Sequence, residues 1–246
     1  MKLKAMSFNI QHCRNYNFRP KDIIDFDVMA DTIAKMGADI CGLNEVRGLG
    51  EDTVWFQEQA KEIADRLGMN YCFAPAINIK GKGPYGNAFI SKYPILQCEN
   101  IPIPDPAPEA RVEGRWYETR CLLKAVIDFM GRPVTVFVTH FGLSPEEAIN
   151  ASETIVKNVS KVSTPKILMG DFNLTPESPI LDPIRIILAD TADVFSEPKL
   201  SFPSDAPEIK IDYMFVSDDI KILNADIPAI IASDHRPYVA TLDIDV

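Results

Sequence analysis

The chain has 246 residues, of which 46% are hydrophobic, and it carries a formal net charge of −10. This acidity counts against a protein that binds long nucleic acids by neutralising phosphates, because such proteins show a basic face. It does not count against a small phosphorylated substrate, since a bound divalent ion supplies local positive charge. No linker or repeat divides the sequence, and no apolar stretch approaches a membrane span. We therefore expect one domain, residues 1–246, without a transmembrane segment.

The cysteines are odd in number and lack the spacing of a metal site. Most stand in apolar, strand-like surroundings, where cysteine is typically a small buried hydrophobe. This pattern favours reduced thiols over a disulfide framework. The first residues show no signal-peptide pattern, which favours a cytoplasmic location; a secreted or periplasmic location is the alternative if a leader was removed. The cysteines are Cys13, Cys41, Cys72, Cys98 and Cys121.

Short apolar strands and amphipathic helices alternate along the chain. Strands are predicted at residues 3–9, 38–43, 71–74, 87–91, 121–127, 134–138, 167–173, 211–216 and 238–243. Helices are predicted at residues 27–36, 53–67 and 144–159, with a shorter helix from residue 178. The helix at residue 144 begins with a capping box formed by Ser144 and Glu147. Residues 80–86 are predicted to form a basic, glycine-containing loop and residues 102–108 a proline-rich connection.

Polar residues close the first two predicted strands. Asn9 ends the first strand, where an asparagine is either a turn residue or a group that orients a carboxylate or a water. His12 follows in a polar loop and is expected at the surface. Glu45 ends an apolar strand, and burying its carboxylate unpaired would be costly. Its partner is either an arginine such as Arg47 or a magnesium ion, which favours oxygen ligands.

Two later strand ends carry further polar groups. His140 ends the strand at 134–138, in a position that suits a catalytic group or a buried structural histidine. Asp171 and Asn173 follow the apolar run that starts at residue 167. In an extended backbone, residues two apart point to the same side, so both would face one cleft and could hold and activate a water. The alternative is a Gly-Asp-x-Asn turn that merely reverses the chain.

Carboxylates and a histidine flank the last two predicted strands. Asp212 begins the strand at 211–216 rather than ending it. Asp234 and His235 stand next to each other just before the final strand. The carboxylate of such a pair can bind a metal or hold an imidazole in one tautomer, and the imidazole can hydrogen-bond a phosphoryl oxygen.

Together these residues favour metal-assisted attack of water on a phosphorus centre. The sequence has no nucleophile elbow, phosphate-cradling GxxxxGK[ST] loop or HExxH helix. In this interpretation Asp171 takes the proton of the water and Asn173 positions the water. The other expected roles are metal placement by Glu45, Asn9 and Asp234, charge stabilisation by His140 and His235, and orientation of one histidine by Asp212. The expected ion is Mg²⁺, with Mn²⁺ or Ca²⁺ as alternatives.

Six short motifs carry a resemblance that spans essentially the whole chain. They are Ser7-Phe8-Asn9-Ile10, Leu43-Asn44-Glu45-Val46, Thr139-His140-Phe141, Gly170-Asp171-Phe172-Asn173, Ile211-Asp212-Tyr213 and Ser233-Asp234-His235-Arg236-Pro237. In this order they resemble the motifs of the endonuclease/exonuclease/phosphatase family. The resemblance implies an α+β four-layer sandwich, with two mixed β-sheets face to face and helices outside. It also implies a magnesium-dependent phosphoester hydrolase, and it assigns substrate contacts to Arg120 and Asn87.

The resemblance gives the chemistry without the substrate. His140 resembles the deoxyribonuclease and sphingomyelinase branches, and Asn44 stands where glutamine is usual. The acidity and short loops favour a small or lipid-head-group phosphodiester. The alternative is a nuclease, which one basic rim beside the cleft would favour; its members would be Lys80, Lys82, Arg115 and Arg120. A catalytically silent binding scaffold on the same fold is the third hypothesis, and it would require a missing site residue.

Overall fold

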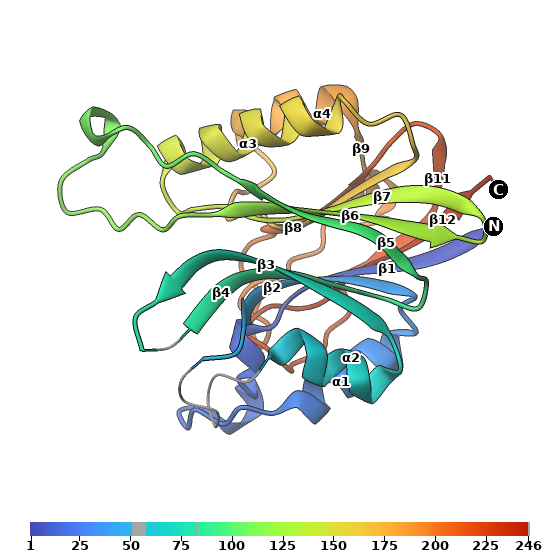
Figure 1. The fold of residues 1–246 in the computed structure, drawn as a ribbon, viewed down its shortest axis with the longest axis horizontal. Helices are drawn as coiled ribbons and strands as arrows, with labels where there is room; N and C mark the ends of the chain where they lie inside the picture. The colour runs from blue at the N-terminus through green and yellow to red at the C-terminus, as the bar shows by residue number, and fades with distance from the viewer. Residues whose placement is uncertain (51–57, 82, 246) are drawn as a thin grey trace.

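A computed structural model describes residues 1–50, 58–81 and 83–245 of the chain. Among these residues, no helix is long and apolar enough to cross a membrane. The two termini lie side by side at one end of the molecule (Figure 1), where the amino group of Met1 donates a hydrogen bond to the Asp243 carboxylate at 2.8 Å.

The first sheet has six strands in the order β11-β12-β1-β2-β4-β3. Strands β1 and β2 run parallel, and the other neighbours in this sheet are antiparallel. The strands are β1 (Lys2–Asn9), β2 (Ile40–Arg47), β3 (Asn70–Ile79), β4 (Gly83–Ser91), β11 (Ile220–Asp226) and β12 (Tyr238–Ile244).

The second sheet also has six strands, in the order β5-β6-β7-β8-β10-β9. Here β7 and β8 form the parallel pair. The strands are β5 (Ile95–Pro102), β6 (Cys121–Phe129), β7 (Arg132–His140), β8 (Lys166–Asp171), β9 (Ala189–Asp190) and β10 (Asp212–Val216).

Helices cover the outer face of each sheet (Figure 1). Helices α1 (Phe26–Met36) and α2 (Gln59–Leu67) pack on the first sheet, and α3 (Pro145–Val159) and α4 (Asp182–Ile187) pack on the second. The largest apolar cluster lies between the sheets and includes residues of both, among them Phe89 and Met169. The predicted α+β four-layer sandwich is therefore confirmed, with a core between the sheets and one under each helical layer.

The register of the strands brings the predicted strand-end residues together. In the parallel pairs, Asn9 lies opposite Asn44 and His140 lies opposite Asp171. Because β10 runs antiparallel to β8, Asp212 at its start lies opposite Asp171. This is why Asp212, which begins β10, meets Asp171, which ends β8.

Glycine is required in β8 at the position that pairs with Thr139 of β7. Gly170 has a φ of +151°, and a Cβ built there would lie 1.9 Å from the carbonyl oxygen of Thr139. A side chain at this position would force β8 away from β7, and Asp171, the next residue, would move with it. Gly170 therefore links the packing of the second sheet to the geometry of the site.

Several predicted boundaries differ from the structure. The start of the predicted helix at 53–67 falls partly outside the described residues, and α2 begins at Gln59. The predicted loop at 80–86 is wrong from Gly83 onward, because β3 extends to Ile79 and β4 starts at Gly83. Pro75 is tolerated within β3 because β3 is an edge strand and its register shifts just after this residue. Strands β5, β9 and β11 were not predicted.

Candidate functional site

Asp171 lies at the centre of the polar cluster formed by the strand ends. Its side chain is 2% exposed, and its Oδ2 accepts a hydrogen bond from Nδ2 of Asn9 at 3.0 Å. Its Oδ1 accepts the backbone N–H of Asn173 at 2.9 Å. Burial raises the pKa of Asp171 above its usual range, and the nearby charge of Asp212 adds to this effect. A carboxylate with a raised pKa suits a general base at neutral pH.

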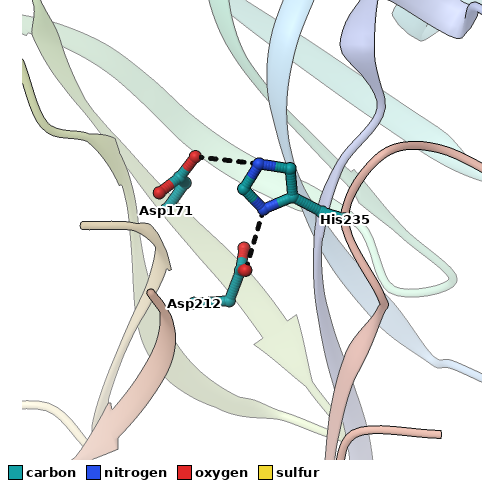
Figure 2. A group of neighbouring side chains, drawn as sticks. All are labelled: Asp171, Asp212 and His235. Atoms are coloured by element: carbon teal, nitrogen blue, oxygen red, sulfur yellow. Dashed lines mark hydrogen bonds and ion pairs between the residues drawn. The ribbon is translucent and has the colours of Figure 1, made fainter. Parts of the chain in front are cut away.

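His235 lies between two carboxylates (Figure 2). Its Nδ1 donates to Oδ2 of Asp212 at 2.9 Å, and its Nε2 lies 3.5 Å from Oδ2 of Asp171. Burial by itself lowers the pKa of His235, but the two carboxylates outweigh burial and raise it to about 10. The imidazole is therefore held protonated, and the ring of Phe202 packs against it with the centroids 4.8 Å apart.

His140, in contrast to His235, is held neutral. Its side chain is buried at the end of β7, with Nε2 3.5 Å from Oδ2 of Asp171. Burial and the guanidinium of Arg120 lower the pKa of His140 well below its usual value. Nη1 of Arg120 lies 3.3 Å from Nδ1 of His140, so Nδ1 accepts and Nε2 carries the proton of a neutral ring. The site thus combines one charged and one neutral imidazole beside the same carboxylate.

Glu45 extends the site from the first sheet. It has a φ of +59° and lies in the register shift of β2 between Leu43 and Val46, a bulge that redirects its side chain. Nδ2 of Asn9 donates to its Oε1 at 3.2 Å, and Nδ1 of His12 lies 3.8 Å from its Oε2. Burial raises the pKa of Glu45, but the nearby imidazoles of His12 and His140 and the hydrogen bond from Asn9 lower it to about 2. The carboxylate is therefore ionised.

A strained turn joins Asp234 to this group. Gln11, His12 and Cys13 all have positive φ, a rare conformation for three consecutive residues with side chains. The turn places Nε2 of Gln11 2.7 Å from Oδ2 of Asp234, and burial raises the pKa of Asp234. His12, expected at the surface, is partly exposed: 30% of its side chain is accessible, and its Nδ1 faces Glu45. Strained backbone of this kind is concentrated at functional sites.

The side chains present fit a divalent cation. Glu45 and Asp234 supply carboxylate oxygens, and Oε1 of Gln11 is buried without a hydrogen-bond partner among the described residues. Oxygen donors of this kind suit Mg²⁺, Mn²⁺ or Ca²⁺. Ligand atoms of the Asp171, Asp212 and His235 group also lie within 4.8 Å of one another, so this buried group could hold a metal. In this group, however, each nitrogen of His235 already faces a carboxylate.

The asparagines have different surroundings from those the sequence suggested. β8 ends at Asp171, and Asn173 has a φ of +49°, so the alternation of an extended strand does not explain their proximity. Nδ2 of Asn173 donates to the carbonyl of Phe141 at 3.0 Å. Asn87 is buried, and its amide accepts from Asn44 and donates to the carbonyl of Cys121. Both polar atoms of the Asn87 amide therefore already have hydrogen-bond partners within the protein. The contact of Asn87 with substrate stays a prediction.

Sequence reasoning underrated Asn44 and did not identify Glu118. Oδ1 of Asn44 accepts the backbone N–H of Asp171 at 3.0 Å, and its Nδ2 donates to the carbonyl of Thr139 at 2.8 Å. Asn44, on the first sheet, thereby fixes the backbone of Asp171 on the second sheet. Its position next to Glu45 was the one feature of the sequence that could have indicated this role. The carboxylate of Glu118 accepts from Nη1 of Arg120, which is only 11% exposed and reaches His140. The spacing of Glu118 and Arg120 was the only signal for that pair.

A model of the Endonuclease/Exonuclease/phosphatase family matches residues 6–235. The chain belongs to this family. The match includes every strand end that contributes to the site. No curated protein matches the chain by sequence.

Solved structures show the same fold. An endonuclease/exonuclease/phosphatase from Bacteroides vulgatus is 19% identical, with a TM-score of 0.78 and 100% of each chain covered. A family protein from Bacteroides thetaiotaomicron is 18% identical, with a TM-score of 0.80, covering 100% of this chain and 99% of its own. The Bacteroides thetaiotaomicron mannosyl-6-phosphatase Bt3783 is 17% identical, with a TM-score of 0.76, covering 98% and 100%. Identities at this level support the fold alone.

Proposed function

We propose that this protein is a divalent-metal-dependent hydrolase that cleaves a phosphodiester bond of a small or lipid-head-group substrate. The observation that carries the proposal is the surrounding of Asp171, whose Oδ2 lies 3.5 Å from the Nε2 atoms of both His140 and His235. A carboxylate of raised pKa is thus placed beside two imidazoles that can donate hydrogen bonds. This arrangement suits removal of a proton from water next to a phosphoryl group.

In this proposal, different residues of the chain carry out different parts of the hydrolysis. Asp171 accepts the proton of the attacking water, and Asn9 holds the carboxylate in place. His235, kept charged by Asp212, and His140 donate hydrogen bonds to the phosphoryl oxygens, where negative charge develops. Glu45, Asp234 and Gln11 would hold a divalent ion. When bound, such an ion polarises the phosphoryl oxygen and stabilises the charge that develops there.

Two observations support a small phosphodiester over a long nucleic acid. The net charge is −10, and two members of the suggested basic rim already face carboxylates. Arg115 lies 3.4 Å from Glu146, and Arg120 is hydrogen-bonded to Glu118. The two arginines of the rim therefore add no support for a nuclease, and Lys82 lies outside the described residues. Similar folds carry the names mannosyl-6-phosphatase and 2′,3′-cyclic phosphatase, so the assay should include both a monoester and a diester.

The test is hydrolysis of bis-p-nitrophenyl phosphate and p-nitrophenyl phosphate with Mg²⁺, Mn²⁺ or EDTA. Plasmid DNA, RNA and vesicles of sphingomyelin or phosphatidylinositol serve as further substrates. We expect metal-dependent cleavage of the diester and of a lipid head group. Cleavage of the monoester alone would make the protein a phosphatase, and selective cleavage of DNA or RNA would make it a nuclease. An absence of turnover on every substrate with either ion would favour the binding scaffold.

A further inference from the structure

The segment between β5 and β6 projects beyond the sheets at the end opposite the termini (Figure 1). This arm, residues 103–120, starts and ends at the same place. The backbone N–H of Ile103 donates to the carbonyl of Arg120 at 3.1 Å, and the Thr119 hydroxyl donates to the Asp105 carboxylate at 3.0 Å. Because Arg120 also reaches His140, the position of the arm sets the position of a guanidinium at the site.

Helix α3 holds the base of the arm. Oε1 of Glu147 accepts the backbone N–H of Glu118 at 2.8 Å, and Nδ2 of Asn150 donates to the carbonyl of Pro104 at 2.9 Å. Glu147 is 5% exposed, whereas the contact of Asn150 lies at the surface. The buried contact with Glu147 is therefore the one that water competes for least.

The carboxylate of Glu147 is itself fixed by the start of α3. Its Oε2 accepts the backbone N–H of Ser144 at 3.1 Å, and its own N–H donates to the Ser144 hydroxyl at 3.2 Å. A Cβ at Gly142 would lie 2.4 Å from Cδ of Glu147, so glycine makes room for the carboxyl group. Both oxygens of Glu147 thus accept backbone hydrogen bonds, one within the capping box and one from the arm.

A continuous series of contacts connects this helix start to the site. Glu147 holds the backbone of Glu118, the carboxylate of Glu118 accepts from Nη1 of Arg120, and the same nitrogen lies 3.3 Å from Nδ1 of His140. We propose that Glu147 is a positioning residue, which anchors the arm so that Arg120 and His140 keep the geometry needed for phosphoester binding. This inference rests on the proposed function, and Glu147 itself touches no reacting atom.

Glu147→Gln tests the anchoring, with Ser144→Ala and Glu153→Gln as matched variants. Glutamine has one acceptor oxygen, and its NH₂ group faces an N–H donor, so one backbone contact is lost. Ser144→Ala removes the hydroxyl of the same capping box but leaves the contact with Glu118 in place. Glu153→Gln changes an exposed carboxylate farther along the same helix. The first readout is tryptic cleavage after Arg111 and Arg115 in the arm, and the second is kcat/KM for bis-p-nitrophenyl phosphate.

We expect Glu147→Gln alone to speed cleavage of the arm and to lower kcat/KM, each by about tenfold, as the loss of one buried hydrogen bond implies. Ser144→Ala should lower the melting temperature without either effect, and Glu153→Gln should behave like the wild type. In an Arg120→Ala background, Glu147→Gln should cause no further loss of kcat/KM, because both changes act through the same guanidinium.

Two results would overturn the inference. The first is unchanged tryptic cleavage in Glu147→Gln, and the second is an equal loss of kcat/KM in Glu147→Gln and Ser144→Ala, which would indicate only a weakened helix. A wild-type protein that hydrolyses no phosphoester would overturn the proposed function and with it the catalytic part of the inference. The tryptic comparison would still decide whether Glu147 anchors the arm.

Discussion

Oδ2 of Asp212 lies 2.9 Å from Nδ1 of His235, and both side chains are buried. The charge of Asp212 therefore keeps the imidazole protonated, although burial alone would favour the neutral ring. The pair converts a histidine into a fixed positive charge beside Asp171. The other oxygen of Asp212, Oδ1, is buried without a hydrogen-bond partner among the described residues.

Asp212→Asn should leave the shape of the pair intact while removing its charge. Because His235 then loses the carboxylate that raises its pKa, we expect kcat for bis-p-nitrophenyl phosphate to fall by about 10²- to 10⁴-fold at neutral pH. Steady-state kinetics and NMR titration of the His235 ring would measure both effects. Wild-type kcat in the Asp212→Asn variant would show that the charge of Asp212 is dispensable.

The pH dependence of kcat/KM should have two limbs. On the acidic side, activity should rise as Asp171 loses its proton, at a pH above the usual range of an aspartate because its pKa is raised. On the alkaline side, activity should fall as His235 loses its proton, near its pKa of about 10. Asp212→Asn should move the alkaline limb to lower pH. A profile without an acidic limb would argue against Asp171 as the base.

Glu45→Gln should weaken metal binding without unfolding the protein. An ionised carboxylate, with a pKa of about 2, is replaced by a neutral amide of the same shape. We expect affinity for Mn²⁺ to fall by about 10- to 100-fold, as measured by electron paramagnetic resonance of free Mn²⁺. Glu99→Gln, which changes an exposed carboxylate on β5, is the control. Equal affinities for the two variants would place the ion elsewhere, with the Asp171, Asp212 and His235 group as the next position to test.

Gly170→Ala should destabilise the protein far more than alanine at an open glycine. A Cβ at Gly170 would lie 1.9 Å from the carbonyl oxygen of Thr139, whereas one at Gly114, which also has positive φ, would meet no atom within 4 Å. We expect losses of about 3 kcal/mol or more for Gly170→Ala and about 1 kcal/mol for Gly114→Ala, from urea unfolding. Similar losses for both variants would show that φ strain, and not the contact with β7, sets the requirement.

The strand-end residues could be predicted from the sequence because each interrupts or borders an apolar run. Parallel registers then bring Asn9 beside the end of β2 and His140 beside Asp171. The left-handed turn at Gln11 could not be predicted, since it contains no glycine to mark it. Strand β5 was missed because it is an edge strand with most of its side chains exposed, so it lacks a regular apolar pattern. The contact between Glu147 and Glu118 joins the start of α3 to the arm across 29 residues of sequence, which no local pattern encodes.

The role of Asp171 as the general base is tested most directly by comparing wild-type protein with Asp171→Asn in metal-dependent hydrolysis of bis-p-nitrophenyl phosphate. Asparagine keeps the size of the side chain but cannot accept the proton of the water. We predict a fall in kcat of about 10²- to 10⁴-fold with unchanged circular dichroism and unchanged dependence on Mg²⁺. A variant that keeps wild-type kcat would contradict the assignment of Asp171 as the group that activates the water.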